Sequence, residues 1–408
     1  MKYLPQLPNK SDCCGCGACA QKCPHFCITM QADSEGFLYP VVNKYECVGC
    51  RLCENSCHVL HPKSSQTPLK AFAATSTNRQ IQLQSSSGGL FSELAAYVIA
   101  QGGCVFGARF DSNWGVVLDY TETLEGLSAF QGSKYIQASP NTAYYDAELL
   151  LKQGRRVLFT GTACQIAALH QFLQKDYELL TTVDVICHGV PSPAVWKHYL
   201  YDVQKLSATD IKSIMFRHKK EGWRKYHIVV ELKSGTFAVD QFHRENTYMN
   251  CFLENLALRP SCFKCRVKKG SSKSDITIAD FWGVENLLPD DNDEGTSLVL
   301  INTRKGATLF KSLPCDHTEV DMMKSLAYNP SWSTCYQEPL GRNVFMKYFR
   351  LFTNHFSEFV YMAIHQNRPL SRKMVYCLDF CLFINKYLHL TVKDGYIKFL
   401  MPANTFKQ

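Results

Sequence analysis

The sequence predicts an α+β protein in three parts: a small, internally duplicated cysteine-rich module, a mixed α/β domain and a helical C-terminal extension. Three observations support this fold class. One cysteine spacing occurs twice within the first 57 residues, strand and helix signals alternate beyond residue 70, and helical apolar periodicity follows residue 335. We expect the parts to span residues 1–62, 68–335 and 336–408.

The composition is that of a folded protein, with 46% hydrophobic and 20% charged residues among 408. The N-terminus lacks the apolar segment of a secretory signal, and no run of about 18 uncharged apolar residues occurs. The most apolar stretch, residues 376–384, is too short to cross a bilayer. We therefore expect a cytoplasmic protein without a transmembrane span, whose cysteines bind metals or react more often than they form disulfides.

Ten of the twenty cysteines lie in the first 57 residues, and eight of them repeat one spacing. The first run is Cys13-x2-Cys16-x2-Cys19-x3-Cys23-Pro24, and the second is Cys47-x2-Cys50-x2-Cys53-x3-Cys57, followed by His58. This is the spacing of bacterial ferredoxins with two 4Fe-4S clusters, where the fourth cysteine binds the other cluster. We expect one cluster at Cys13, Cys16, Cys19 and Cys57, and another at Cys47, Cys50, Cys53 and Cys23. Zinc is the alternative, although its sites separate two CxxC pairs by a finger. Cys14 and Cys27 fit no ligand position.

The predicted elements follow in order along the chain. Two short strands are expected around a turn at residues 34–36, and a linker rich in Pro, Ser and Lys at residues 61–70. Further strands are expected at residues 71–76, 104–110, 115–121, 156–161, 179–189, 211–218, 226–233, 275–283 and 297–306. Helices are expected at residues 87–103, 142–154, 162–173 and 191–206. Residues 342–383 predict two amphipathic helices broken at Arg368-Pro369. We expect these helices to pack on the core; a docking surface for a partner or for an anionic membrane is the alternative.

No G-x-G-x-x-G follows a predicted strand, so a Rossmann dinucleotide site is not indicated. Two other turns precede helices, at residues 85–89 and at Gly161-Thr162. Their N–H groups would suit a phosphate, and an ordinary helix cap is the alternative explanation.

Seven segments occur in a characteristic order: SSSGGLFSELA, QGSKYIQAS, VLFTGTACQIAAL, VICHGVPSPAVW, FRHKKEGW, RPSCFKC and DITIADFWG. Together they resemble the beta subunit of the coenzyme F420 hydrogenase/dehydrogenase family over roughly residues 10–335. The resemblance implies a flavoprotein that carries FAD and iron–sulfur clusters and exchanges electrons with a small redox partner. It also implies FAD contacts from Ser87, Gly88, Gly89, Lys134, Gly161, Thr162 and Gln165. Ala163 replaces a proline that is frequent in the family.

Four further cysteines lie in these segments: Cys164, Cys187, Cys262 and Cys265. We expect them to hold a third 4Fe-4S cluster beside the flavin. Zinc and ordinary buried thiols are the alternatives. Lys134 and His188 are candidate catalytic residues, and Asp280 is a candidate polar contact of the cofactor site. Residues 216–227 interleave basic and aromatic side chains, which suits either the mouth of this site or a solvated turn.

The resemblance predicts an FAD- and iron–sulfur-dependent oxidoreductase that relays electrons to or from an unidentified two-electron substrate. The alternatives are a non-catalytic electron-transfer subunit and a flavin-free interaction protein. Candidate partners are a redox protein (a ferredoxin-like donor or a reductase- or hydrogenase-type subunit), a small molecule such as a deazaflavin, and a second copy of the chain. No nucleic-acid partner is expected, because negatively charged clusters would offset the net charge of +8.

Overall fold

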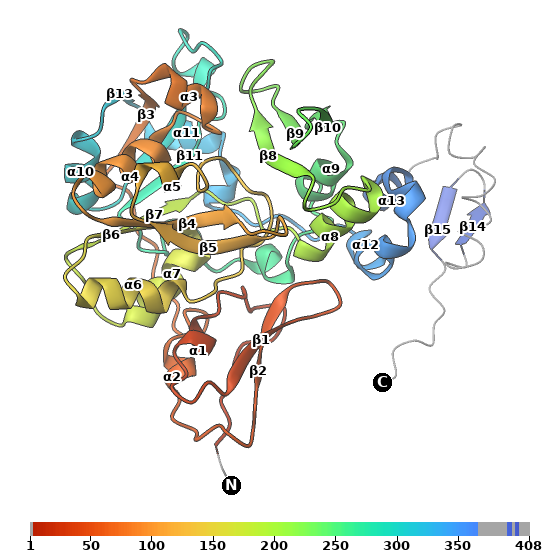
Figure 1. Cartoon of the computed structure of the whole chain (residues 1–408), viewed down its shortest axis with the longest axis horizontal. Coiled ribbons are helices and arrows are strands. Elements are labelled where there is room, and N and C mark those ends of the chain that lie inside the picture. Colours follow the sequence, from red (N-terminus) through yellow and green to blue (C-terminus); the bar gives the residue numbers. More distant parts are fainter. Residues whose placement is uncertain (1–2, 366–389, 394–395, 400–408) are drawn as a thin grey trace.

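The computed structural model describes residues 3–365, 390–393 and 396–399, and its first part is a small cysteine-rich module (Figure 1). Its elements are α1 (Ala18–Gln21), β1 (Ile28–Ala32), β2 (Leu38–Val42) and α2 (Leu52–Asn55). The strands pair antiparallel around the expected turn. Each short helix begins after a residue with positive φ, Gly17 at 73° and Arg51 at 64°. The two cysteine runs therefore enter equivalent left-handed turns.

The main domain is built on an eight-stranded sheet of order β13-β3-β12-β11-β7-β6-β4-β5. Its strands are β3 (Lys70–Ser76), β4 (Cys104–Phe110), β5 (Val116–Thr121), β6 (Val157–Thr162), β7 (Leu180–Val185), β11 (Ile276–Asp280), β12 (Ser297–Ile301) and β13 (Cys315–Glu319). The central strands β4, β6, β7 and β11 are parallel, and the flanking strands pair antiparallel. The predicted mixed α/β domain is therefore confirmed, with parallel and antiparallel pairing in one sheet.

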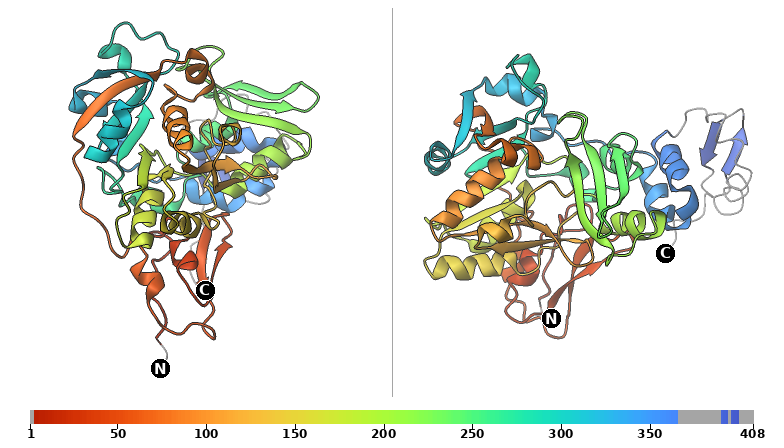
Figure 2. Two further views of the ribbon diagram at one scale, coloured as in Figure 1. Left: turned by 60° about the vertical axis from the view of Figure 1, so that its left-hand side comes forward. Right: turned by 45° about the horizontal axis from the view of Figure 1, so that its top comes forward.

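Helices cover both faces of this sheet (Figures 1 and 2). Successive residues of a strand point to opposite faces, so Phe106 and Phe159 join one core with α6 and α7, whereas Val105 and Leu158 join another with α4. The helices are α3 (Arg79–Gln84), α4 (Leu90–Ala100), α5 (Leu124–Leu127), α6 (Ala143–Lys152), α7 (Ala163–Leu173), α10 (Arg304–Lys311) and α11 (Met322–Ala327).

A second, three-stranded sheet stands beside the first, with the order β10-β9-β8. It consists of β8 (Ile211–His218), β9 (His227–Leu232) and β10 (Phe237–Phe242). It packs with α8 (Pro193–Lys197) and its π-helical continuation (His198–Val203), α9 (Thr247–Leu253), α12 (Arg342–Tyr348) and α13 (Phe356–Ile364). Short 3-10 turns lie at Pro260–Lys264, Val284–Asn286, Pro330–Trp332, Phe349–Leu351 and Thr353–His355.

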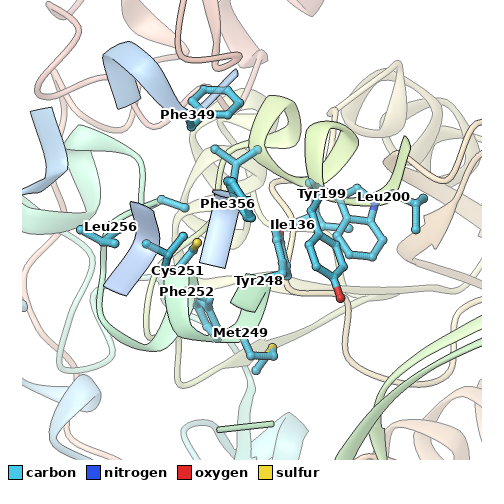
Figure 3. Packing of buried hydrophobic residues seen from close by; sticks show 14 of the residues in the cluster. Ile136, Tyr199, Leu200, Tyr248, Met249, Cys251, Phe252, Leu256, Phe349 and Phe356 are labelled. Atoms are coloured by element: carbon cyan, nitrogen blue, oxygen red, sulfur yellow. The ribbon is translucent and has the colours of Figure 1, made fainter. Parts of the chain in front are cut away.

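The largest hydrophobic core of the described chain is aromatic and joins these elements (Figure 3). Tyr248 and Phe252 of α9 pack in the same cluster as Phe356 of α13. Phe37 and Tyr39 of the cysteine-rich module also belong to this cluster. The module is therefore not a separate body on a flexible tether.

The C-terminal extension differs from the predicted all-helical segment. Helices run to Ile364, as expected for the first part, and Leu390–Lys393 (β14) then pairs antiparallel with Tyr396–Phe399 (β15). The sequence signal for this pairing is Asp-Gly between two short alternating runs, which is typical of hairpins. The expected break at Arg368-Pro369, the second helix and the apolar stretch 376–384 lie outside the described residues. Within the described ranges, no helix is both long and apolar enough to cross a membrane.

Candidate functional site

The first expected thiol group lines a small cavity inside the module. Its four members, Cys13, Cys16, Cys19 and Cys57, surround a space of about 20 Å³ together with apolar side chains such as Leu7 and Met30. Burial raises the pKa of the Cys19 thiol, and the neighbouring Cys13 and Cys57 raise it further. All of the described cysteines are free thiols. Four soft sulfur donors around an apolar space fit the ligand set of an iron–sulfur cluster.

The second group has three buried members and one exposed member. Cys23, Cys47 and Cys53 are buried in one cluster, whereas Cys50 is exposed. The same cluster contains Cys27, whose Sγ lies 3.3 Å from Sγ of Cys23. Three of the four expected ligands therefore share one buried cluster, and Cys27 belongs to it without fitting the spacing.

The third group meets where the module contacts the main domain. Cys164 lies in the first turn of α7, Cys187 follows β7, and Cys262 and Cys265 lie in or next to the 3-10 turn Pro260–Lys264. All four line a space of about 70 Å³, here called the thiol cavity. Strands β6 and β7 are neighbouring parallel strands, so their following loops meet at one edge of the sheet.

The thiol cavity has a cationic wall that includes Arg259, Lys264, Arg266 and Lys268. Nζ of Lys268 donates to the main-chain oxygen of Cys187 at 3.2 Å. Burial raises the pKa of Cys262 to about 12 and that of Cys265 to about 11. Thiolates held here need a compensating charge, which a metal ion supplies directly and this wall supplies in part. The donor set fits an iron–sulfur cluster.

Sequence reasoning missed two side chains of this cavity, Cys14 and His58. Sγ of Cys14 lies 3.1 Å from Nε2 of His58. The Cys14 thiol and burial together raise the pKa of Cys164, so the module's Cys14 lies next to a ligand expected for the third cluster. Burial lowers the pKa of His58 to about 4, which keeps its ring neutral. The available signals were an additional cysteine inside the first motif and, after the second motif, histidine in place of proline.

A much larger cavity of about 660 Å³ collects most residues expected to contact FAD. Its lining includes Ser87, Gly89, Lys134, Gly161, Thr162, Gln165, His188 and Asp280. The volume lies within the range of small-molecule and cofactor sites. Gly88 is different: its N–H donates to Oγ of Ser297 at 3.0 Å, and a Cβ at Gly88 would lie 2.4 Å from the oxygen of Ala74. Gly88 therefore packs on the sheet instead of facing this large cavity.

Two helices begin at the large cavity. Gly89 is the N-cap of α4, and Thr162 is the N-cap of α7. Free N–H groups and the helix dipole at such ends favour an anion. Gln165 has a second task, because its Oε1 accepts the main-chain N–H of Thr162 at 2.8 Å in a capping box.

Lys134 lies in the wall of the large cavity with its ammonium turned to its own loop. Nζ donates to three main-chain oxygens, those of Phe130 at 3.3 Å, Gln131 at 3.0 Å and Gly132 at 3.1 Å. Burial lowers its pKa to about 7. The side chain thus holds the loop 130–134 closed beside the cavity.

His188 lines both the thiol cavity and the large cavity. Its Nε2 lies 2.7 Å from Oδ1 of Asn255, and its ring packs against those of Tyr336 and Phe252 at centroid distances of 4.2 and 4.9 Å. Burial lowers the pKa of His188 to about 4. A neutral, hydrogen-bonded ring favours a role in shaping the wall over one as a general acid.

The two cavities share a wall. Thr162, Gln165 and the residues 185–190 after β7 line both of them. Cys187 is part of this shared wall, so one expected cluster ligand also borders the large cavity. A group bound by the four thiols would therefore be adjacent to a molecule in the large cavity.

Part of the chain matches a known protein family. Residues 154–322 match the family model for the C-terminal part of the beta subunit in coenzyme F420 hydrogenase/dehydrogenase. This match runs from the residues before β6 to the start of α11 and confirms the family resemblance there; the cysteine-rich module lies outside it. No curated protein matches the chain. A chain of the F420-reducing [NiFe] hydrogenase complex from Methanosarcina barkeri is 16% identical, with a TM-score of 0.44 over 65% of this chain and 91% of that chain. This likeness is too distant to establish a shared fold.

Proposed function

Because residues 154–322 belong to the coenzyme F420 hydrogenase/dehydrogenase beta-subunit family, we propose that the chain is an iron–sulfur flavoprotein oxidoreductase. It relays electrons between 4Fe-4S clusters and FAD, to or from a redox partner protein or a two-electron substrate such as a deazaflavin. The observation that carries this proposal is the common wall of the thiol cavity and the large cavity.

The proposed cofactors have complementary chemistry: iron–sulfur clusters exchange single electrons, whereas a flavin exchanges two electrons or a hydride. The chain's residues hold them close together. Cys164, Cys187, Cys262 and Cys265 bind the third cluster, and the cationic wall around Lys268 offsets its negative charge. The contact of Cys14 with Cys164 brings the ferredoxin-type module against the same site.

FAD is proposed to occupy the large cavity. The N-termini of α4 and α7 offer N–H groups to its diphosphate, with Ser85, Ser86 and Ser87 as further polar groups in the wall. Aromatic rings from Tyr135, Phe252 and Trp282 line the same space and suit a planar ring system. Lys134 acts here by positioning its loop beside the cofactor.

Anaerobic purification followed by iron, acid-labile sulfide and flavin analysis tests the proposal. We expect about twelve irons, from three 4Fe-4S clusters, and about one FAD for each chain. Eight irons would contradict the third cluster. A chain that takes up no flavin after reconstitution would contradict the flavoprotein assignment and favour an electron-transfer subunit.

Substitution of Cys262 sharpens this test. Cys262→Ser removes one of the four thiols, so about four irons should be lost while the ferredoxin-type clusters keep their electron paramagnetic resonance signals. Cys335→Ser is the matched control, because Sγ of Cys335 lies 3.5 Å from the oxygen of Cys265 without lining the thiol cavity. Cys14→Ser should also retain all the irons. Iron loss with Cys14→Ser and none with Cys262→Ser would show that the ligand set is wrong.

A further inference from the structure

Three arginines of the described chain are almost completely buried, and in two of them every side-chain nitrogen has a hydrogen-bond partner. Arg259 donates from Nε to Cys13 O, from Nη1 to Gln137 Oε1 and from Nη2 to Leu38 O, at 2.8 to 2.9 Å. Each nitrogen of Arg342 likewise donates to Glu35 or to the oxygen of Leu258. Burial of a guanidinium normally requires such pairing.

Arg217, the third of them, breaks this rule. Its side chain is 2% exposed, and its Nη1 donates to Oδ2 of Asp280 at 2.7 Å. Its Nε and Nη2 are buried and have no hydrogen-bond partner in the part of the chain that the structure describes. Arg217 also lines the large cavity. A buried cation with two unused donors in a cavity wall points to a ligand.

The unused donors are the pair best suited to recognise an anion. The N–H of Nε and one N–H of Nη2 leave the planar guanidinium on the same side and form a fork. Such a fork matches two adjacent acceptor atoms, as in a carboxylate or a phosphate. The other side of the group is held by Asp280, which also accepts Nε1–H of Trp223 at 3.3 Å. Asp280 is therefore a positioning residue for Arg217.

Aromatic rings surround the guanidinium of Arg217. Its guanidinium carbon lies 4.3 Å from the ring centroid of Tyr226 and 5.1 Å from that of Trp282. Tyr135, whose hydroxyl lies 3.5 Å from Nη1, stacks on Phe252 at 4.7 Å. Phe252 in turn contacts His188, which reaches the thiol cavity. A planar ring could therefore lie along this wall with its anionic edge at Arg217.

The charges of the large cavity favour an anion at this point. Asp280 is the one carboxylate in the described lining, and it is already paired with Arg217. Lys134, the other basic side chain of the lining, donates to three main-chain oxygens. Arg217 is therefore the charged group of this wall that keeps donors free.

We propose that Nε and Nη2 of Arg217 bind an anionic group with two adjacent acceptor atoms, carried by a planar ring in the large cavity. This deepens the proposed function, on which its biological meaning rests. The group has two sources: the pyrimidine edge of a flavin, which gains negative charge when two electrons and one proton enter the ring, or a carboxylate or phosphate of the substrate.

Two measurements on the anaerobically reconstituted chain test the proposal and distinguish these sources. The first is the midpoint potential of bound FAD, and the second is calorimetric binding of 1-naphthoate compared with neutral 1-naphthamide. The variants are Arg217→Gln and Arg217→Lys. Arg224→Gln is the matched control, because Arg224 lies in the connection that follows β8, pairs with Asp291 and Asp293, and does not line the cavity.

If the flavin is the source, Arg217→Gln should disfavour flavin reduction at least tenfold, a fall of about 30 mV for a two-electron couple. If the substrate is the source, the wild-type chain should prefer 1-naphthoate at least tenfold, and both Arg217 variants should lose this preference. Wild-type values for both measurements in a folded Arg217→Lys variant would overturn the proposal.

The test still gives an answer if a variant does not fold or if the chain binds no FAD. If Arg217→Gln does not fold, the double variant Arg217→Gln/Asp280→Asn replaces it, because this change also removes the carboxylate that would be left unpaired. If the wild-type chain binds no FAD, the proposed function fails, but the naphthoate measurement still tests the anion site of Arg217. Equal affinities for naphthoate and naphthamide in that flavin-free chain would overturn the anion site as well.

Discussion

At the scale of single residues, the large cavity contains a lysine whose charge is costly to keep. The ammonium of Lys134 is satisfied by three oxygens of its own loop, yet burial lowers its pKa from 10.5 to about 7. In the unfolded chain the same amine keeps its proton up to about pH 10.5. Between these two values the unfolded state binds more protons than the folded state, so folding stability rises with pH.

We expect this dependence to disappear in the variant Lys134→Met. As the pH increases from 7 to 10, the thermal unfolding midpoint of the cofactor-free wild-type chain should rise relative to that of Lys134→Met. The exposed Lys152, four residues from its ion-pair partner Glu148, provides the control Lys152→Met, which should follow the wild type. Parallel pH curves for wild type and Lys134→Met would contradict a buried amine at position 134.

The residue scale is also where sequence reasoning was least complete. The GSKY segment predicted Lys134 as a residue of the cofactor site. It did not predict that the ammonium of Lys134 donates hydrogen bonds to the preceding turn. Arg217 lies in a basic and aromatic segment that was interpreted either as the mouth of the site or as a solvated turn. Its two unpaired donors can be identified only from the structure, where all of its described neighbours are known. Cys14 has no signal in the ligand spacing, because its contacts with His58 and Cys164 are made by distant parts of the chain.

At the scale of elements, the start of α7 combines a structural role with a proposed ligand site. Thr162 and Gln165 form a capping box, and both also line the two cavities. The resemblance implied FAD contacts for these residues, and their local hydrogen bonds show a second function. The cap fixes the start of α7, where Thr162 and Gln165 line the large cavity.

Gln165→Ala should lower the free energy of unfolding by about 1 kcal/mol, because the N–H of Thr162 loses its acceptor. Gln165→Glu retains an oxygen at the same place and should remain close to the wild type. Denaturant unfolding of the cofactor-free chain measures both. Equal stability of the alanine and glutamate variants would argue that this hydrogen bond contributes nothing to the helix start.

Most strands were predictable from short apolar, β-branched runs such as those of β6, β7 and β12. Their order in the sheet was not, because β3 pairs with β12 and β13 far along the chain and no local pattern encodes that choice. The hairpin β14–β15 was missed because helical periodicity before it was extended across the whole C-terminal segment.

At the scale of the whole molecule, two buried arginines attach the cysteine-rich module to the rest of the chain. Arg342 of α12 pairs with Glu35 in the module's turn, with Nη2 2.6 Å from Oε2, and also donates to the oxygen of Leu258. Arg259 donates to the main-chain oxygens of Cys13 and Leu38 in the module. This attachment fixes the module's thiols relative to the thiol cavity.

Arg342→Met should lower the free energy of unfolding by about 3 kcal/mol, because it leaves Glu35 and a buried carbonyl without their donor. Arg350→Met is the control: Arg350 is exposed and donates to Ser34 O in the same turn at 3.0 Å, so its loss should cost less than about 0.5 kcal/mol. Chemical denaturation compares the two. Similar losses for both variants would mean that the buried pair does not hold the module in place.

The contact of Gly15 with Arg259 has a consequence for how related sequences can diverge. Gly15 has φ of 69°, and a Cβ there would lie 2.6 Å from Nη1 of Arg259 and 2.9 Å from the oxygen of Leu38. The two positions are therefore expected to change together over evolutionary time. A related chain with a side chain at position 15 should no longer have arginine at position 259, and its module should then sit differently on the main domain.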